Sequence, residues 1–156
     1  MRVGQGFDIH PFSDDPARRL ILGGVEIPGA RGLAGHSDAD VVAHALTDAV
    51  LGAAALGDIG THFPDADPAY AGVNSLLLLA KAVGLARGAG FEPVNADCTV
   101  IAEEPRLAPH ASAMGAALGG AFGGPVSVKA TRAEGLGALG RAEGIACIAV
   151  ALVSRL

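Results

Sequence analysis

The sequence has no tryptophan, a single tyrosine and only two cysteines among its 156 residues. Aromatic residues make up 4% of the chain and hydrophobic residues 51%, so the core must be built mainly from aliphatic and small side chains. Cys98 and Cys147 lie in apolar, strand-like stretches and form no Cys-x-x-Cys arrangement. This pattern predicts two buried, reduced thiols.

Basic residues are scarce, with 11 Lys and Arg against 16 Asp and Glu and a net charge of −5. This balance excludes a protein that binds nucleic acid through a basic surface, so any bound phosphate should be held locally. Long apolar runs are also missing, since residues 145–153 fall far short of the roughly 20 residues of a membrane-spanning helix. The charged N-terminal strand does not fit a signal peptide. We therefore expect a cytoplasmic protein with no membrane partner.

The length and apolar content predict a single domain over residues 1–156. The apolar surplus also favours further burial in an oligomer. The expected element order indicates an α+β fold in which helices cover one face of a mixed β-sheet. We expect strands over 2–10 and 20–27 (with a bulge or tight turn at 23–24), helices over 38–56 and 74–87, a strand over 94–102, a short helix before 119, and strands over 126–130 and 145–153.

The stretch from residue 35 to 44 places two histidines around a helix start. Ser37 is a good N-cap, and Asp40 three residues later resembles the second member of a capping box. His44 lies one turn after Asp40 and Asp48 one turn further, so carboxylates are available to orient the imidazole. Taken alone, however, this pattern favours a capped surface helix with an incidental histidine.

The N-terminal strand changes that interpretation. Its apolar side chains fall on one face, while Asp8 and His10 share the other and are close enough to hold one metal ion. Adding His44 gives two nitrogens and one carboxylate. Three protein ligands with an open fourth position are typical of a catalytic zinc ion.

Two further stretches carry polar groups whose role the composition leaves open. Residues 58–68 are rich in carboxylates, glycine and proline, which suits either part of a site or a solvated connector. After the expected strand over 126–130, Thr131, Arg132 and Glu134 precede several glycines. That combination suits a phosphate with its divalent cation, or else a flexible hairpin loop with ordinary surface charges.

Six short motifs run in order through nearly the whole chain. Together they resemble the 2-C-methyl-D-erythritol 2,4-cyclodiphosphate synthase family. The resemblance implies an enzyme of the non-mevalonate isoprenoid pathway, which converts 4-diphosphocytidyl-2-C-methyl-D-erythritol 2-phosphate into the cyclic diphosphate and CMP. It also implies a homotrimer with active sites between neighbouring subunits. The motifs are Phe7-Asp8-Ile9-His10, His36-Ser37-Asp38-Ala39-Asp40, His44-Ala45-Leu46-Thr47-Asp48, Leu56-Gly57-Asp58-Ile59-Gly60, Phe63-Pro64-Asp65 and Gly140-Arg141-Ala142-Glu143-Gly144-Ile145-Ala146.

The resemblance also implies roles for particular residues. Zinc, or another divalent transition metal, would be held by Asp8, His10 and His44, and Asp8 and His10 would also contact the substrate. Magnesium or manganese on the substrate diphosphate would be held by Glu134. His36 and Arg132 are the candidate catalytic residues, and Ala138 and Arg141 belong to the substrate-binding set. The phosphate and methylerythritol end of the substrate would meet His36 and Ser37. The sugar-alcohol pocket and its flexible wall would consist of Asp58, Ile59, Gly60, Phe63, Pro64, Asp65, Ala66 and Asp67. Cytidine and its phosphate would be bound by the neighbouring subunit, through Ala102, Arg106, Leu107, Ala108 and Thr131.

The chain departs from the family pattern at four positions. Arg132 and Ala133 replace threonines, Arg106 replaces a lysine of the cytidine segment, and Ala138 replaces an aromatic residue. The last change removes the basis for carrying over the apolar cavity along the trimer axis. Two other functions stay open: a mononuclear zinc phosphoesterase that releases a linear product, and a non-catalytic ligand-binding trimer in which Arg132 abolishes activity.

Overall fold

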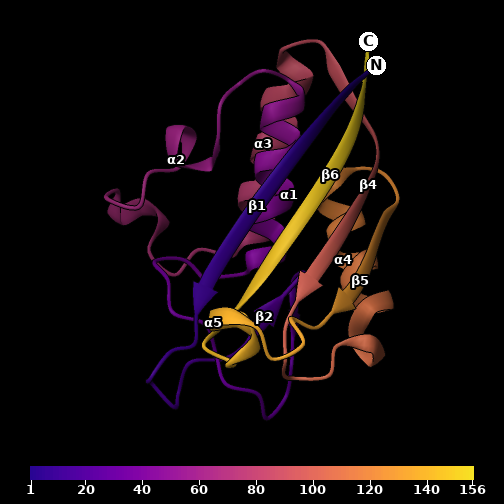
Figure 1. Ribbon diagram of the computed structural model, residues 1–156. Helices are drawn as coiled ribbons and strands as arrows, with labels where there is room; N and C mark the ends of the chain where they lie inside the picture. The colour runs from indigo at the N-terminus through magenta and orange to yellow at the C-terminus, as the bar shows by residue number, and fades with distance from the viewer.

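The computed structural model describes residues 1–156, which form an α+β fold with helices on one face of a four-stranded sheet (Figure 1). The strand order is β1-β6-β4-β5. The sheet is mixed, because β6 pairs antiparallel with both β1 and β4, while β4 and β5 are parallel. This confirms the expected architecture. The strands are β1 (Arg2–Pro11), β4 (Phe91–Ile101), β5 (Val126–Thr131) and β6 (Gly144–Arg155), with β2 (Ile21–Leu22) and β3 (Val25–Glu26) in a separate hairpin.

Three long helices lie behind the sheet and enclose the core with it (Figure 1). The largest core cluster holds 31 buried residues, most of them Ala, Val and Leu, as the composition predicts. Cys98 and Cys147 are buried and free, which confirms the expected reduced thiols. None of the helices is long and apolar enough to cross a membrane. The helices are α1 (Val41–Ala53), α3 (Ser75–Gly88) and α4 (Ala111–Phe122), with the single turns α2 (Ile59–His62), α5 (Gly137–Gly140), η1 (Pro68–Tyr70) and η2 (Ala108–His110).

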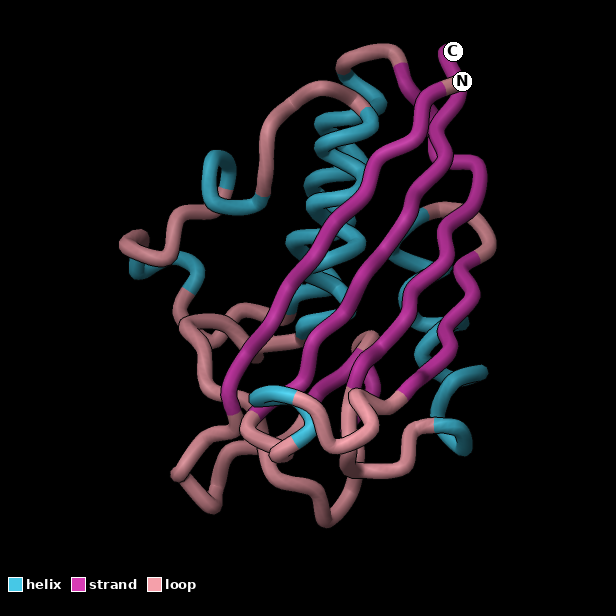
Figure 2. The backbone as a smooth tube through the Cα atoms, viewed as in Figure 1, coloured by secondary structure: helices cyan, strands magenta, loops and turns pink.

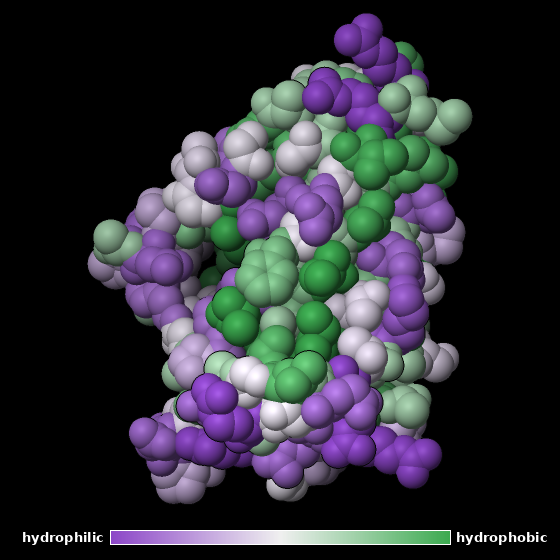
Figure 3. All heavy atoms as spheres, in the orientation of Figure 1, coloured by the Kyte–Doolittle hydropathy of each residue, from purple (hydrophilic) through white to green (hydrophobic).

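Strand β1 packs its glycines against α1 and turns its apolar side chains outward. A Cβ atom added at Gly4 or Gly6 would lie 1.9 Å from a carbonyl oxygen of α1, so only glycine permits this close contact. Phe7 and Ile9 lie on the opposite face and are 50% and 48% exposed. Figure 3 shows the resulting apolar patch over β1 and β6, on the face turned away from the helices. The two faces of β1 are divided as predicted, and its apolar face is the exposed one.

Helix α1 begins later than its local sequence suggests. The N-cap is Asp40, whose side chain accepts hydrogen bonds from the backbone N–H groups of Val42 and Ala43, each at 3.1 Å. The prediction of a helix start at residue 38 with Ser37 as its N-cap is therefore wrong. Asp40 also accepts from the N–H groups of Gly23 and Gly24, at 2.8 and 2.7 Å. These long-range bonds to the β2–β3 turn favour Asp40 over Ser37 as the cap.

Several other boundaries also differ from the sequence expectation. Residues 20–27 form two short strands, joined by a tight turn at Gly23 and Gly24, both with positive φ. Helix α4 runs through its expected end at residue 119, because Gly123 adopts the left-handed conformation that closes it. Asn74 caps α3.

The loops that follow β1, β4 and β5 gather at one end of the sheet, while the two termini lie at the other (Figure 2). Asp8 and His10 stand near the end of β1. The parallel β4 and β5 end together, since Ile101 is paired with Thr131. The fold thus directs three strand ends that carry predicted site residues toward the same end of the molecule.

Candidate functional site

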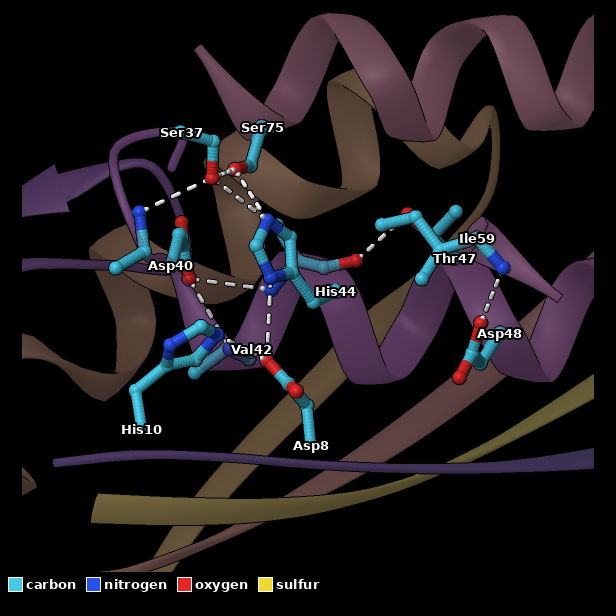
Figure 4. A network of polar contacts seen from close by, with 12 residues as sticks. Asp8, His10, Ser37, Asp40, Val42, His44, Thr47, Asp48, Ile59 and Ser75 are labelled. Atoms are coloured by element: carbon cyan, nitrogen blue, oxygen red, sulfur yellow. Dashed lines mark hydrogen bonds and ion pairs between the residues drawn. The ribbon is translucent and has the colours of Figure 1, made fainter. Parts of the chain in front are cut away.

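The predicted metal ligands meet where the end of β1 lies beside the first turn of α1 (Figure 4). His10 Nε2 lies 3.0 Å, and His44 Nδ1 lies 3.1 Å, from the same carboxylate oxygen of Asp8. Potential ligand atoms of all three residues lie within 4.8 Å of one another. The structure therefore brings Asp8, His10 and His44 together, as the sequence predicts.

The outer nitrogen of each imidazole is occupied by a second partner. His10 Nδ1 lies 2.8 Å from the carbonyl oxygen of Ala34, which only accepts, so the proton is on Nδ1 and the Nε2 lone pair is left for a ligand bond. His44 Nε2 lies 2.8 Å from Ser75 Oγ and 3.1 Å from Ser37 Oγ (Figure 4). Metal-ligating histidines are held in this way by the nitrogen that does not bind the metal.

This donor set fits a divalent cation. Two ligands placed about 2.0–2.1 Å from a tetrahedral zinc ion lie roughly 3.3 Å apart, close to the separations between Asp8 and each histidine. One carboxylate and two imidazoles leave a fourth position for a substrate atom. The residues present therefore suit zinc or a similar transition metal.

The charges of the triad support the same interpretation. Burial by itself raises the pKa of Asp8, but the hydrogen bonds and the charge interactions with His10 and His44 together outweigh it, and the net shift is downward. Burial lowers the pKa of His10, but the hydrogen bond and charge of Asp8, the Ala34 carbonyl and the charge of Asp65 together outweigh this effect, and the net shift is upward. Asp8 thus stays ionised and attracts positive charge, whether a proton or a metal ion.

Ser75 is a member of this site that the sequence did not reveal. It is fully buried at the start of α3, where its Oγ donates to the carboxylate of Asp38 and its N–H donates to the same group over 3.1 Å. The expected orienting carboxylates have other roles: Asp40 caps α1, and Asp48 accepts from the Ile59 N–H at 2.7 Å. Because His44 and Ser75 lie 31 residues apart, no local spacing pattern could have linked them.

A hollow of about 210 Å³ opens beside the triad. His36 and Ser37 line it, and so do four members of the predicted sugar-alcohol pocket. Tyr70 is a further wall residue that the sequence did not indicate, and its ring meets Phe63 edge-on at 5.6 Å. Of the predicted pocket, Ile59, Gly60, Phe63 and Asp65 line this hollow, whereas Asp58, Pro64, Ala66 and Asp67 lie outside it.

Asp58 and Asp67, which lie outside the hollow, support segments of its wall through hydrogen bonds. Asp58 caps α2 and accepts from both the N–H and the hydroxyl of Thr61. These bonds lower the pKa of Asp58. The carbonyl of Asp67 lies 3.2 Å from His36 Nε2. Residues 58–70 thus contain two short helical turns, both of which contribute to the wall, so this stretch is not only a solvated connector.

A second hollow, of about 380 Å³, forms where β4 and β5 end. The pairing of these parallel strands continues in the bond from the Ala102 N–H to the Thr131 carbonyl, at 3.0 Å. This brings the predicted cytidine segment next to Thr131 although the two are far apart in sequence. The hollow is lined by Ala102, Glu103, Pro105, Arg106, Leu107, Ala108, Ala130, Thr131 and Arg132 and shares no residue with the first.

Arg132 is held at the rim of the second hollow by a carboxylate. Its Nε lies 3.3 Å from an oxygen of Glu103, which the sequence did not single out. The Glu103 side chain is only 14% exposed, whereas that of Arg132 is 66% exposed. Arg132 therefore lines the rim of the second hollow, where its pairing with Glu103 holds the guanidinium in place.

Apart from the four residues of the predicted sugar-alcohol pocket named above, three more predicted substrate or metal residues line neither hollow within the chain. Glu134 is exposed with a φ of 55°, Ala138 is exposed in α5, and Arg141 pairs with Glu143 at 3.0 Å. Glu134 is also separate from the Asp8, His10 and His44 cluster.

The fold and the two hollows define a single α+β protein with a candidate divalent-cation centre and a separate pocket of mixed charge. Residues 1–154 match the YgbB family, to which the chain therefore belongs. Curated relatives from Symbiobacterium thermophilum and Bordetella petrii, both described as 2-C-methyl-D-erythritol 2,4-cyclodiphosphate synthase, are each 56% identical to it over 157 residues. The alignments cover 99% of this chain in both cases, and 99% and 96% of the relatives.

Solved structures agree with this assignment. The structure described as an IspF–CDP complex from Plasmodium falciparum has a TM-score of 0.84 and 32% identity, with 99% of this chain and 96% of that chain covered. A bifunctional IspDF from Campylobacter jejuni has a TM-score of 0.94 and 42% identity, and this chain spans 42% of that longer protein. The resemblance seen in the sequence motifs is thus confirmed.

Proposed function

We propose that the chain is a 2-C-methyl-D-erythritol 2,4-cyclodiphosphate synthase. It converts 4-diphosphocytidyl-2-C-methyl-D-erythritol 2-phosphate into the cyclic diphosphate and CMP. The observation that carries this proposal is the Asp8, His10 and His44 triad beside a hollow, in a chain 56% identical over its length to synthases. An oxygen of the 2-phosphate attacks the β-phosphorus, and the bond from that phosphorus to the CMP oxygen breaks. The reaction needs no protein nucleophile, so the protein acts by positioning and by neutralising charge.

The residues around the first hollow divide this work. Asp8, His10 and His44 would hold the divalent cation, which when bound supplies Lewis-acid stabilisation of phosphate charge. The carbonyl of Ala34 and the hydroxyl of Ser75 keep the two imidazoles in orientation. His36 and Ser37 would meet the phosphate and methylerythritol end, and Phe63 and Asp65 belong to the pocket wall.

The second hollow suits the cytidine and its phosphate. Thr131 offers a hydroxyl, and Arg106 and Arg132 offer guanidinium groups that suit a phosphate. Glu103 offsets one of these charges, which leaves a net positive lining for an anionic ligand. Glu134 would hold magnesium or manganese on the diphosphate, and Ala138 and Arg141 would stand near the same ligand.

We further propose a homotrimer whose active sites are shared between subunits. Phe7, Ile9 and Val150 on the free sheet face are 41–50% exposed in the single chain and provide an apolar surface for association. The two hollows share no residue. In such an assembly, the second hollow of one subunit would face the metal centre of the next.

Product analysis tests the proposed reaction. Purified protein with zinc and magnesium is incubated with the cytidyl substrate, and phosphorus NMR and mass spectrometry identify the products. The expected result is the cyclic diphosphate with one equivalent of CMP, lost in His44→Ala. A linear hydrolysis product would indicate a zinc phosphoesterase, and binding without turnover would indicate a ligand-binding trimer. Either outcome would overturn the proposal.

A further inference from the structure

Arg18 lies in the loop between β1 and β2 and directs its guanidinium at one short segment, residues 33–37. Its Nε donates to the carbonyl of Leu33 over 2.9 Å. One terminal nitrogen donates to the carbonyls of Gly35 and Ser37, over 3.1 and 2.6 Å. None of the ion pairs of the chain includes Arg18. All three hydrogen bonds of the Arg18 side chain thus go to residues 33–37.

The carbonyls of the segment bond to Arg18 in alternation with other partners. Those of residues 33, 35 and 37 accept from Arg18, whereas that of Ala34 lies 2.8 Å from His10 Nδ1 and that of His36 accepts from the Gly72 N–H at 2.9 Å. Arg18 therefore fixes the carbonyls on both sides of Ala34, whose own carbonyl holds a metal ligand.

The same segment carries an outer partner of each histidine ligand. The Ala34 carbonyl orients His10, and Ser37 Oγ lies 3.1 Å from His44 Nε2. Gly35 packs directly on the His10 ring, since an added Cβ atom would lie 3.1 Å from Nδ1. A shift of this segment would displace the partners of both imidazoles at once.

We propose that Arg18 is a positioning residue for the divalent-cation centre, acting through residues 33–37 on His10 and His44. The inference rests on the metal site of the proposed function. Arginine suits this role because its donors form a rigid planar fork, whereas a lysine offers one ammonium group and cannot reproduce the same directions. Arg18 belongs neither to the metal-ligand cluster nor to the lining of either hollow, so its role is one of positioning.

Zinc affinity of the purified protein, measured by competition with a chromophoric chelator, tests this inference without any turnover. Loss of an outer partner of a metal ligand typically costs 10–100-fold in metal affinity. Arg18 acts one step further out, so we expect Arg18→Ala and Arg18→Lys to raise the zinc dissociation constant about tenfold. The visible absorption of the Co²⁺-loaded protein should change as well, because it reports ligand geometry.

Arg19 provides the matched control. It is the next residue, is exposed, and forms only a 3.5 Å ion pair with Glu26. Arg19→Ala should keep the zinc affinity and the Co²⁺ spectrum of the unmodified chain. Ethylguanidinium at millimolar concentration should restore part of the affinity of Arg18→Ala but not alter that of Arg19→Ala.

A double variant distinguishes positioning from general destabilisation. If Arg18 acts through the segment, the effects of Arg18→Lys and Ser37→Ala on zinc affinity should be less than additive. Should Arg18→Ala fail to fold, Arg18→Lys decides the question. Unchanged zinc affinity and spectrum in a folded Arg18 variant would overturn the inference. If the unmodified chain bound no zinc at all, the metal site of the proposed function would fail instead.

Discussion

At the scale of single residues, the site depends on pairs whose members are far apart in sequence. Asp8 lies beside the imidazole of His44, Ser75 holds His44 from the opposite side, and Glu103 holds Arg132. Each of these contacts fixes the direction of a side chain that the proposed chemistry requires. The corresponding substitutions should therefore change binding or turnover more than they change stability.

Ser75→Ala should weaken zinc binding by about 10–100-fold, because it removes the closer of the two hydroxyls that hold His44 Nε2. Competition with a chelator measures this affinity. Ser112→Ala, at an exposed position on α4, serves as the control and should leave the affinity unchanged. Equal affinities in the two variants would show that Ser75 has no part in orienting His44.

Arg132→Ala should lower kcat and kcat/KM together, by about a factor of 10 to 1,000, if the guanidinium stabilises charge that develops on the phosphates. Arg132→Thr should recover part of the loss, since it restores a hydroxyl donor. Steady-state kinetics with the cytidyl substrate measure both constants. Unchanged kinetics in Arg132→Ala would show that the group stays with Glu103 during turnover.

At the scale of elements, the two helix caps of the site should differ in their energetic importance. The carboxylate of Asp40 accepts hydrogen bonds both from the first turn of α1 and from the β2–β3 turn. Burial raises the pKa of Asp40, and these hydrogen bonds from backbone N–H groups partly offset the shift. Asn74 caps α3 at an exposed position through one bond.

We expect Asp40→Ala to lower the free energy of unfolding by about 2–5 kcal/mol, since it leaves several buried N–H groups without a partner. Asn74→Ala should cost only about 1 kcal/mol. Urea unfolding followed by circular dichroism compares the two variants. A similar loss in both would contradict the importance assigned to the buried Asp40 cap.

The pairing of β4 with β5 should depend on pH through Asp97. Hydrogen bonds from Lys129 and Ser127 lower the pKa of this carboxyl. Its contribution to stability is therefore present above the unfolded-state pKa of about 3.9, and is lost as the pH falls through the lower folded value. Because Asp97 is half exposed, Asp97→Asn should cost at most about 1 kcal/mol at pH 7 and nothing near pH 2. Urea unfolding at the two pH values measures this difference, and an equal loss at both would contradict it.

At the scale of the whole molecule, the proposed homotrimer predicts complementation between two defective chains. Asp8→Ala removes a metal ligand, and Thr131→Ala alters the second hollow. Mixed and refolded together, these chains should regain part of the activity, because a mixed trimer contains some intact sites. Sedimentation gives the oligomeric state, and a monomer in solution would contradict the assembly.

The sequence by itself determined the element types, the position of Asp8 and His10 on one strand face, and the family. Periodicity and ordered motifs carry this information because they depend on residues that are neighbours in the chain. The same reasoning placed the helix cap at Ser37 and suggested Asp40 and Asp48 as partners of His44. It gave no indication of Ser75, Arg18 or Glu103.

Only the tertiary structure decided those contacts. Asp40 is the cap because the β2–β3 turn provides two further N–H donors for its carboxylate. Ser37 therefore does not cap α1, and its hydroxyl faces His44. Ser75 reaches His44 because α3 packs beside α1. Hydrogen-bond partners on different elements are chosen by how those elements pack, and this packing leaves no periodic pattern in either segment.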